Sequence, residues 1–130
     1  MAEETILIVE DNEKNRKLAR DVLTFRGYRV TVAESAEEGL GIARETPPDL
    51  ILMDIHLPGM NGIEALAELR AGEATRNIPV LAFTASVMPQ DRHMITGAGF
   101  DGFLSKPIAI KEFGDMIADA LAKRAGKGGA

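Results

Sequence analysis

The sequence predicts a single α/β domain with a parallel sheet covered by helices on both faces. Short apolar segments alternate with segments of helical periodicity, which is the pattern of repeated βα units. Three of the apolar segments are unbroken runs, as expected of strands buried on both faces. The chain has 130 residues, which fits one domain of the usual size, about 100–150 residues. We expect the domain to span residues 1–124 and a flexible Gly-rich tail to follow at 125–130.

The five expected strands are short segments rich in apolar and β-branched residues. They cover residues 5–9, 29–33, 49–53, 79–83 and 102–104. In the second segment Val30 and Val32 alternate with polar residues, and the fifth segment is very short. Because central strands of a parallel sheet read as continuous apolar runs, these two segments are expected at the sheet edges.

The expected helices have apolar residues three or four positions apart. The first core-facing stripe consists of Leu18, Val22 and Phe25, and the last consists of Phe113, Met116, Ile117, Ala120 and Leu121. Ser35 and Asn61 each precede a Glu by three residues, which is the N-terminal capping pattern, and Gly27 suits the end of the first helix. Pro89 suits the first turn of a fourth helix over about residues 89–97.

The βα units predict where a binding site should lie. Five units fit a flavodoxin-like (βα)5 three-layer sandwich with strand order 2-1-3-4-5 and right-handed crossovers. In such sheets ligands bind beyond the carboxyl ends of the strands, where the strand order reverses. We therefore expect the site between the first and third strands.

The composition excludes several classes of protein. The chain has no Cys, which excludes a disulfide framework and a thiol nucleophile. Its 15 basic and 20 acidic residues give a net charge of −5, and Trp is absent, which argues against a nucleic-acid-binding module. No apolar run reaches the ~20 residues of a membrane span, and the acidic start lacks the features of a signal peptide. We therefore expect a cytoplasmic protein whose partners include neither nucleic acid nor membrane.

Polar residues of complementary chemistry follow four of the strands. They are Glu10 and Asp11 after the first, Asp54 after the third, Thr84 after the fourth, and Ser105, Lys106 and Pro107 after the fifth. Three carboxylates repel one another, but they suit the oxygen preference of Mg²⁺. Lys106 adds a charge for a phosphoryl oxygen, and a carboxylate can form an aspartyl phosphate. Asp54 is the preferred phosphoacceptor because it is a lone carboxylate at the end of a central strand.

Each of these residues has a simpler explanation when it is taken alone. Asp54 could be a turn residue or a helix cap, residues 10–12 could be a capping segment, and Lys106 could be a solvated surface residue. The joint arrangement, in the chain order acid pair, acid, hydroxyl and lysine, favours phosphate chemistry.

These residues lie in four motifs that together resemble a known family. The motifs are IVEDN at 8–12, LMDIHLPGMNG at 52–62, FTA at 83–85 and SKP at 105–107. In this order and at this spacing, the chain resembles the response-regulator receiver domains of bacterial two-component signalling over about residues 5–122. The pattern is most similar to stand-alone cell-division receivers of the DivK type and to receivers of hybrid kinases.

The resemblance implies a role for each matched acid. Asp54 would accept a phosphoryl group from a phosphohistidine on a histidine kinase or a histidine phosphotransfer protein. Asp11, Asp54 and the backbone carbonyl of His56 would bind Mg²⁺, for which Mn²⁺ could substitute. Glu10 would bind the ion through water.

The resemblance also implies a switch. Lys106, in a cis peptide with Pro107, would pair with the phosphoryl group; Thr84 would swing towards that group, and Phe103 would follow inward. The face formed by the fourth helix, fifth strand and fifth helix would then bind a downstream protein. The resemblance implies a protein that is a monomer or weak dimer and is not an enzyme, although it promotes its own phosphoryl transfer and autodephosphorylation.

Two positions depart from the commonest family pattern. The acid pair is Glu-Asp rather than Asp-Asp, and Phe103 stands where Tyr is more common, so any switching must rest on packing. Met88, Met94 and Ile95 could give the switching face an apolar patch or could be ordinary core residues. His93 is expected at the surface.

Three alternatives stay open. A phosphatase of the haloacid dehalogenase type would need a second Asp two residues after the nucleophile, where this chain has His56. A flavin mononucleotide binder would need a Ser-, Thr- and Gly-rich loop after the first strand, where residues 10–13 are mostly acidic. A receiver-shaped scaffold that is never phosphorylated would act by binding alone, although Asp54, Thr84 and Lys106 argue against it.

Overall fold

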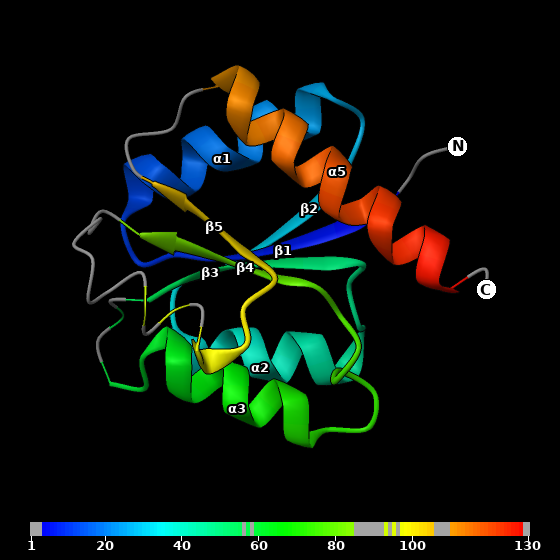
Figure 1. The fold of residues 1–130 in the computed structure, drawn as a ribbon. Helices are drawn as coiled ribbons and strands as arrows, with labels where there is room; N and C mark the ends of the chain where they lie inside the picture. Colours follow the sequence, from blue (N-terminus) through cyan, green and yellow to red (C-terminus); the bar gives the residue numbers. More distant parts are fainter. Residues whose placement is uncertain are drawn as a thin grey trace.

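The computed structural model of the chain describes residues 4–55, 57, 59–84, 93, 95, 97–105 and 110–128. Its five strands form one parallel sheet in the order β2-β1-β3-β4-β5. Figure 1 shows the sheet as the middle layer between two layers of helices. The predicted flavodoxin-like sandwich and its strand order are therefore confirmed.

The strands begin and end within one residue of the predicted segments. They are β1 (Thr5–Val9), β2 (Arg29–Ala33), β3 (Leu50–Asp54), β4 (Val80–Thr84) and β5 (Gly102–Ser105). β2 and β5 occupy the two edges, as their alternating and short sequences predict. Every residue of β3 is buried, which explains its unbroken apolar run before the terminal Asp.

The described helices cover both faces of the sheet. α1 (Glu13–Phe25) and α5 (Ile110–Gly128) lie on one face, and α2 (Ala36–Glu45) and α3 (Gly62–Ala71) lie on the other (Figure 1). In the region of the expected fourth helix, residues 93, 95, 97 and 98 are helical. Met88, Pro89 and Met94 lie outside the described residues. His93 is exposed, as expected, and Ile95 is buried, so Ile95 is a core residue.

Side-chain caps begin α2 and α3 where the sequence predicts them. The Asn61 side chain accepts from the Glu64 N–H at 2.9 Å while the Glu64 carboxylate accepts from the Asn61 N–H at 3.0 Å, a complete capping box. Ser35 Oγ accepts from the Glu38 N–H at 3.1 Å, but the Glu38 carboxylate accepts from the N–H of Glu34 at 2.8 Å. The cap at Ser35 is therefore present without the reciprocal bond that defines the box.

The core consists mainly of two clusters, one on each side of the sheet. In β1 the side chains alternate, so Leu7 and Val9 pack in the cluster with α2 and α3, while Ile6 and Ile8 pack in the cluster with α1 and α5. This packing fixes the helices against the sheet. It thereby fixes the loops that leave the carboxyl ends of the strands.

Three members of the predicted core stripes are exposed. Phe25 is 92% exposed and Met116 37% exposed, so their assignment to the core was wrong. In α1 the buried residues are Ala19 and Leu23. Because successive helical residues are rotated by about 100°, Phe25 points about 200° away from Leu23. Leu18, on the same side as Phe25, is exposed as well, at 38%, so its assignment to the core was also wrong.

The C-terminal helix is longer than the sequence suggests. α5 continues to Gly128, past the domain boundary expected at residue 124. Residues 129–130 lie outside the described residues, and the flexibility of 125–130 stays a prediction. None of the described helices is long and apolar enough to cross a membrane.

Candidate functional site

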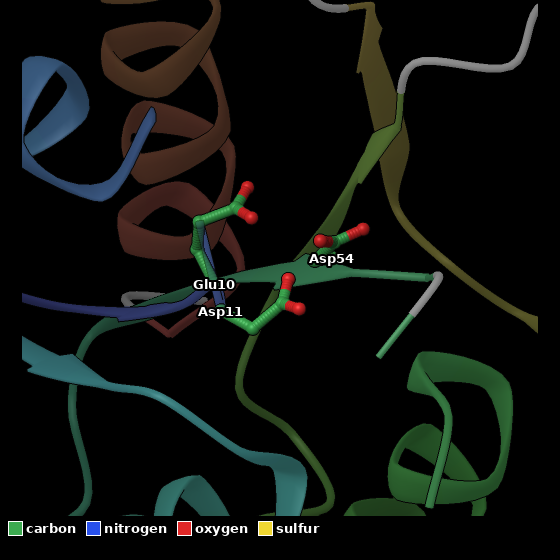
Figure 2. A group of neighbouring side chains, drawn as sticks. All are labelled: Glu10, Asp11 and Asp54. Carbon is green, nitrogen blue, oxygen red and sulfur yellow. The ribbon is translucent and has the colours of Figure 1, made fainter. Parts of the chain in front are cut away.

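The carboxyl ends of β1 and β3 bring three acidic side chains together. β1 and β3 are hydrogen-bonded neighbours with Val9 opposite Met53, so Glu10 and Asp54 follow at the same edge of the sheet. Carboxylate oxygens of Glu10, Asp11 and Asp54 lie within 4.8 Å of one another. Figure 2 shows these side chains at the adjoining ends of the two strands. We call the three residues the acid cluster.

The acid cluster combines two buried carboxylates with one exposed carboxylate. Glu10 is 0% and Asp54 is 3% exposed, whereas Asp11 is exposed. Buried negative charge is stabilised by hydrogen bonds or by a cation, and carboxylates offer the hard oxygen ligands that Mg²⁺ prefers. With Mg–O distances of about 2.1 Å, octahedral ligands lie about 3 to about 4.2 Å apart. The cluster therefore fits one such ion after small side-chain movements, and Asp11 gives it access to solvent.

Hydrogen bonds from three directions hold Glu10. Its N–H donates to the carbonyl of Ala33 at the end of β2 at 3.0 Å, and its Oε2 accepts from the N–H of Asn12 at 3.0 Å. Its carbonyl accepts from Nη1 of Arg16 at 3.0 Å. Asn12 is also the N-cap of α1. The sequence patterns did not mark Arg16, although a long donor in the first turn of a helix can reach back to the preceding loop.

The start of α3 lies directly against the backbone of Asp54. The Gly62 N–H donates to the carbonyl of Ile55 at 3.1 Å. A Cβ added at Gly62 would overlap the carbonyl oxygen of Asp54 and lie 2.9 Å from Cα of Ile55. Glycine therefore permits an approach that a side chain would prevent. The sequence marks Gly62 as part of a capping pattern and as the last residue of a motif, but neither indicates that two backbones are in contact here.

Thr84 is the last residue of β4, so it lies at the carboxyl ends of the strands, as the acid cluster does. Asp54 pairs with Phe83 across β3 and β4, and Thr84 pairs with Ser105 of β5. The structure describes the backbone of Thr84 but not its side chain. The register thus puts Thr84 one residue beyond the neighbour of Asp54, and the direction of its hydroxyl stays a prediction.

Phe103 lies in β5 at the boundary of a small third apolar cluster. It pairs with Ala82 of β4 and is half-buried. It packs against the buried residues Ile55, Ala82 and Ile95. Ile55 follows Asp54 in the chain, and Ile95 belongs to the region of the expected fourth helix. Phe103 therefore contacts a cluster that joins the end of β3 to that region.

Three predicted site residues lie outside the part of the chain that the structure describes. They are His56, Lys106 and Pro107. The metal-binding carbonyl of His56, the charge of Lys106 near the phosphoryl group and the cis bond to Pro107 accordingly stay predictions.

Known families and relatives match most of the chain. The family model for the response regulator receiver domain matches residues 6–118. The polar-differentiation response regulator DivK of Brucella ovis is 44% identical over 117 residues, which are 90% of this chain and 95% of that relative. The protein of the same name from Brucella anthropi is 42% identical over 117 residues.

Solved structures match the fold equally well. One is the receiver domain of the sensor histidine kinase PA1611 from Pseudomonas aeruginosa PAO1, which has a magnesium ion coordinated in its active site cleft. It is 34% identical with a TM-score of 0.86, covering 93% of this chain and 99% of that one. A CheY-like response regulator receiver domain protein from Methanospirillum hungatei is 26% identical with a TM-score of 0.89, covering 97% and 99%. Because these matches extend over nearly all of the sheet and its helices, the chain belongs to the response regulator receiver domain family.

Proposed function

We propose that this chain is a phospho-accepting receiver of a two-component phosphorelay. Asp54 takes a phosphoryl group from a phosphohistidine on a histidine kinase or histidine phosphotransfer protein, in the presence of Mg²⁺. The observation that carries the proposal is the acid cluster: a nearly buried carboxylate ends a central strand, with two more acidic side chains beside it. Membership of the receiver family supports it and disfavours the phosphatase and flavin-binding alternatives.

The proposed chemistry is a direct transfer between two side chains. A carboxylate oxygen of Asp54 attacks phosphorus, an O–P bond forms, and the P–N bond to the donor imidazole breaks. The bonding electrons stay with the imidazole nitrogen, which takes up a proton from solvent. Glu10, Asp11 and Asp54 are the described residues that would hold Mg²⁺, and the ion would supply charge neutralisation for the phosphoryl oxygens. Lys106 would offset charge on the other side of the phosphoryl group.

The proposed output is a change of surface that a protein partner reads. The phosphoryl group adds about 1.5 to 2 negative charges at the strand ends. Thr84 would turn towards it and leave space beside Phe103. Because Phe103 packs against the cluster of Ile55, Ala82 and Ile95, its movement would disturb the region of the fourth helix. We propose a cytoplasmic protein, a monomer or weak dimer, whose target binds the face formed by that region, β5 and α5.

Phosphate labelling tests the proposal. Incubation with acetyl phosphate and Mg²⁺ should add the mass of one phosphoryl group to the intact protein, and a metal chelator should prevent the addition. Asp54→Asn should abolish it, because an amide is a poor nucleophile. Asp21→Asn removes an exposed carboxylate from α1 and should label like the wild type.

Two outcomes would contradict the proposal. Labelling that persists in Asp54→Asn would place the acceptor elsewhere. A wild-type protein that takes no phosphoryl group under any of these conditions would instead favour the scaffold that acts by binding alone.

A further inference from the structure

Arg16 connects the first turn of α1 to the loop that carries two members of the acid cluster. Its Nη1 donates to the carbonyl of Glu10 at 3.0 Å and lies 3.5 Å from the carbonyl of Asp11. Arg16 is half-buried, whereas Lys17 and Arg20 of the same helix are exposed. It therefore differs from its basic neighbours in having a fixed place against the main chain of the site.

The geometry points to Arg16 as a positioning residue for the divalent ion, an inference that rests on the proposed function. The peptide unit between Glu10 and Asp11 is planar, so the direction of the Glu10 carbonyl also sets the position of the Asp11 Cα. The Glu10 N–H is already held by Ala33, at 3.0 Å. Arg16 fixes the other side of the same residue, and thereby the plane from which the Asp11 carboxylate projects.

The loop that carries this plane is short. Residues 10–12 are the whole connection between β1 and α1. Loss of the Arg16 bond would remove one restraint on the direction of the Glu10 carbonyl, and any turn of that carbonyl would move the exposed Asp11 with it. The exposed ligand is the one whose position depends most on the backbone, because the buried Glu10 side chain is also held by the Asn12 N–H.

The charge of Arg16 acts in the opposite direction from its positioning role. A guanidinium near a cation repels it, so removal of the charge alone would tighten Mg²⁺ binding. Removal of the positioning bond would weaken Mg²⁺ binding, because the ligands would lose their common direction. The half-buried guanidinium is partly screened by solvent and salt, so we expect the positioning effect to dominate.

Mg²⁺ titration of four proteins by isothermal titration calorimetry separates these effects. Arg16→Ala should weaken the affinity roughly tenfold, the lower end for groups that orient metal ligands without touching the metal. Arg16→Lys keeps the charge and one donor and should recover part of that loss. Arg20→Ala removes an exposed arginine of the same helix and should stay within about twofold of the wild type, since exposed charges interact weakly. At saturating Mg²⁺ the phosphoryl labelling rate of Arg16→Ala should return to that of the wild type.

The outcomes distinguish this inference from the function on which it rests. If the wild type binds Mg²⁺ and Arg16→Ala binds it equally or more tightly, the positioning role is overturned. A labelling defect that persists at saturating Mg²⁺ also overturns it, because it indicates general structural damage. A wild type that binds no Mg²⁺ overturns the proposed function and this inference together. Should thermal unfolding show that Arg16→Ala does not fold, Arg16→Lys carries the test, and an affinity no weaker than that of Arg20→Ala overturns the role.

Discussion

At Gly62 the backbone of α3 comes close enough to β3 that no side chain fits between them. The two nearest atoms are the Asp54 carbonyl oxygen and the Ile55 Cα, and both belong to the backbone. A residue with a Cβ must therefore move one of the two backbones. Since β3 is the central strand that ends in the acid cluster, the movement would fall on α3 or on Asp54 itself.

Gly62→Ala should consequently lower both stability and phosphoryl labelling. We expect a loss of about 1–3 kcal/mol in the free energy of unfolding, the usual effect of overpacking. Urea unfolding measures this loss, and the labelling rate at saturating Mg²⁺ measures the displacement of Asp54. A variant with the wild-type rate and wild-type stability would show that the approach of the two backbones is not restrictive.

The residues of the site differ in how far a sequence can predict them. The closeness of Glu10, Asp11 and Asp54 follows from the fold, because the carboxyl ends of parallel strands meet at one edge. Arg16 and Gly62 act on main-chain atoms, which are the same in every residue. No pairing of side-chain types could therefore reveal them before the loop conformations were known.

At the scale of elements, α2 contains two glycines with opposite surroundings. A Cβ at Gly39 would lie 2.7 Å from Cγ2 of Val9, the buried last residue of β1. Val9 is β-branched and has little freedom to rotate away. Gly41 is exposed, and no atom lies within 4 Å of its added Cβ.

Alanine at these two positions should therefore change stability in opposite directions. Gly41→Ala should stabilise the protein by about 0.5–1 kcal/mol, because Gly is unfavourable inside a helix. Gly39→Ala should destabilise it by about 1–3 kcal/mol through overpacking against β1. Urea unfolding of both variants gives the comparison. Equal effects at the two positions would show that helix propensity alone decides, and that α2 does not pack closely on Val9.

The elements also show where hydrophobic periodicity fails. In α5 the predicted stripe is correct for Phe113, Ile117 and Leu121, which are buried, and wrong for Met116 at its flank. In α1 the buried line runs instead through Ala19 and Leu23. Periodicity shows which residues share a side of a helix. It does not show how wide a strip the sheet covers, or which of two possible lines faces it.

Across the whole molecule, Arg70 joins several segments at the amino ends of the strands, away from the acid cluster at their carboxyl ends. Its Nη1 donates to the carbonyls of Arg76 at 3.0 Å and Ile78 at 2.7 Å. Its Nη2 lies 3.0 Å from the carboxylate of Asp101, which also accepts from the N–H of Val80 at 2.8 Å. Val80 begins β4, and Asp101 directly precedes β5. One side chain of α3 thus holds the amino ends of two strands.

Arg70→Ala should reduce stability without affecting the acid cluster. We expect the free energy of unfolding to fall by about 1–2 kcal/mol, because charge-assisted bonds to the backbone are lost at a partly exposed position. Mg²⁺ affinity should stay at the wild-type value, since the acid cluster lies at the opposite ends of the strands. Arg44→Ala is the control: its 3.1 Å ion pair with Glu68 is exposed, so its removal should change stability by less than about 0.5 kcal/mol. A clear change in Mg²⁺ affinity for Arg70→Ala would show that the amino and carboxyl ends of the strands are coupled.

The architecture of the whole molecule was the easiest level to predict. Residues 6–9 and 50–53 are continuous apolar runs because a central parallel strand is buried on both faces, and this pattern can be recognised without any knowledge of contacts. Strand order then follows from general rules of chain connection. Contacts such as that of Arg70 with Asp101 join residues 31 positions apart and depend on loop geometry. They carry no local pattern in the chain.

The exposure of Phe25 has a practical consequence. It is the last residue of α1, at the end of that helix remote from the acid cluster, and its ring is 92% exposed. The chain contains no cysteine. Phe25→Cys would therefore create a single thiol for attaching a fluorophore. The fluorescence anisotropy of the dye would rise when a partner binds, because the larger complex tumbles more slowly. Complex formation could then be followed in solution while the core and the acid cluster stay untouched.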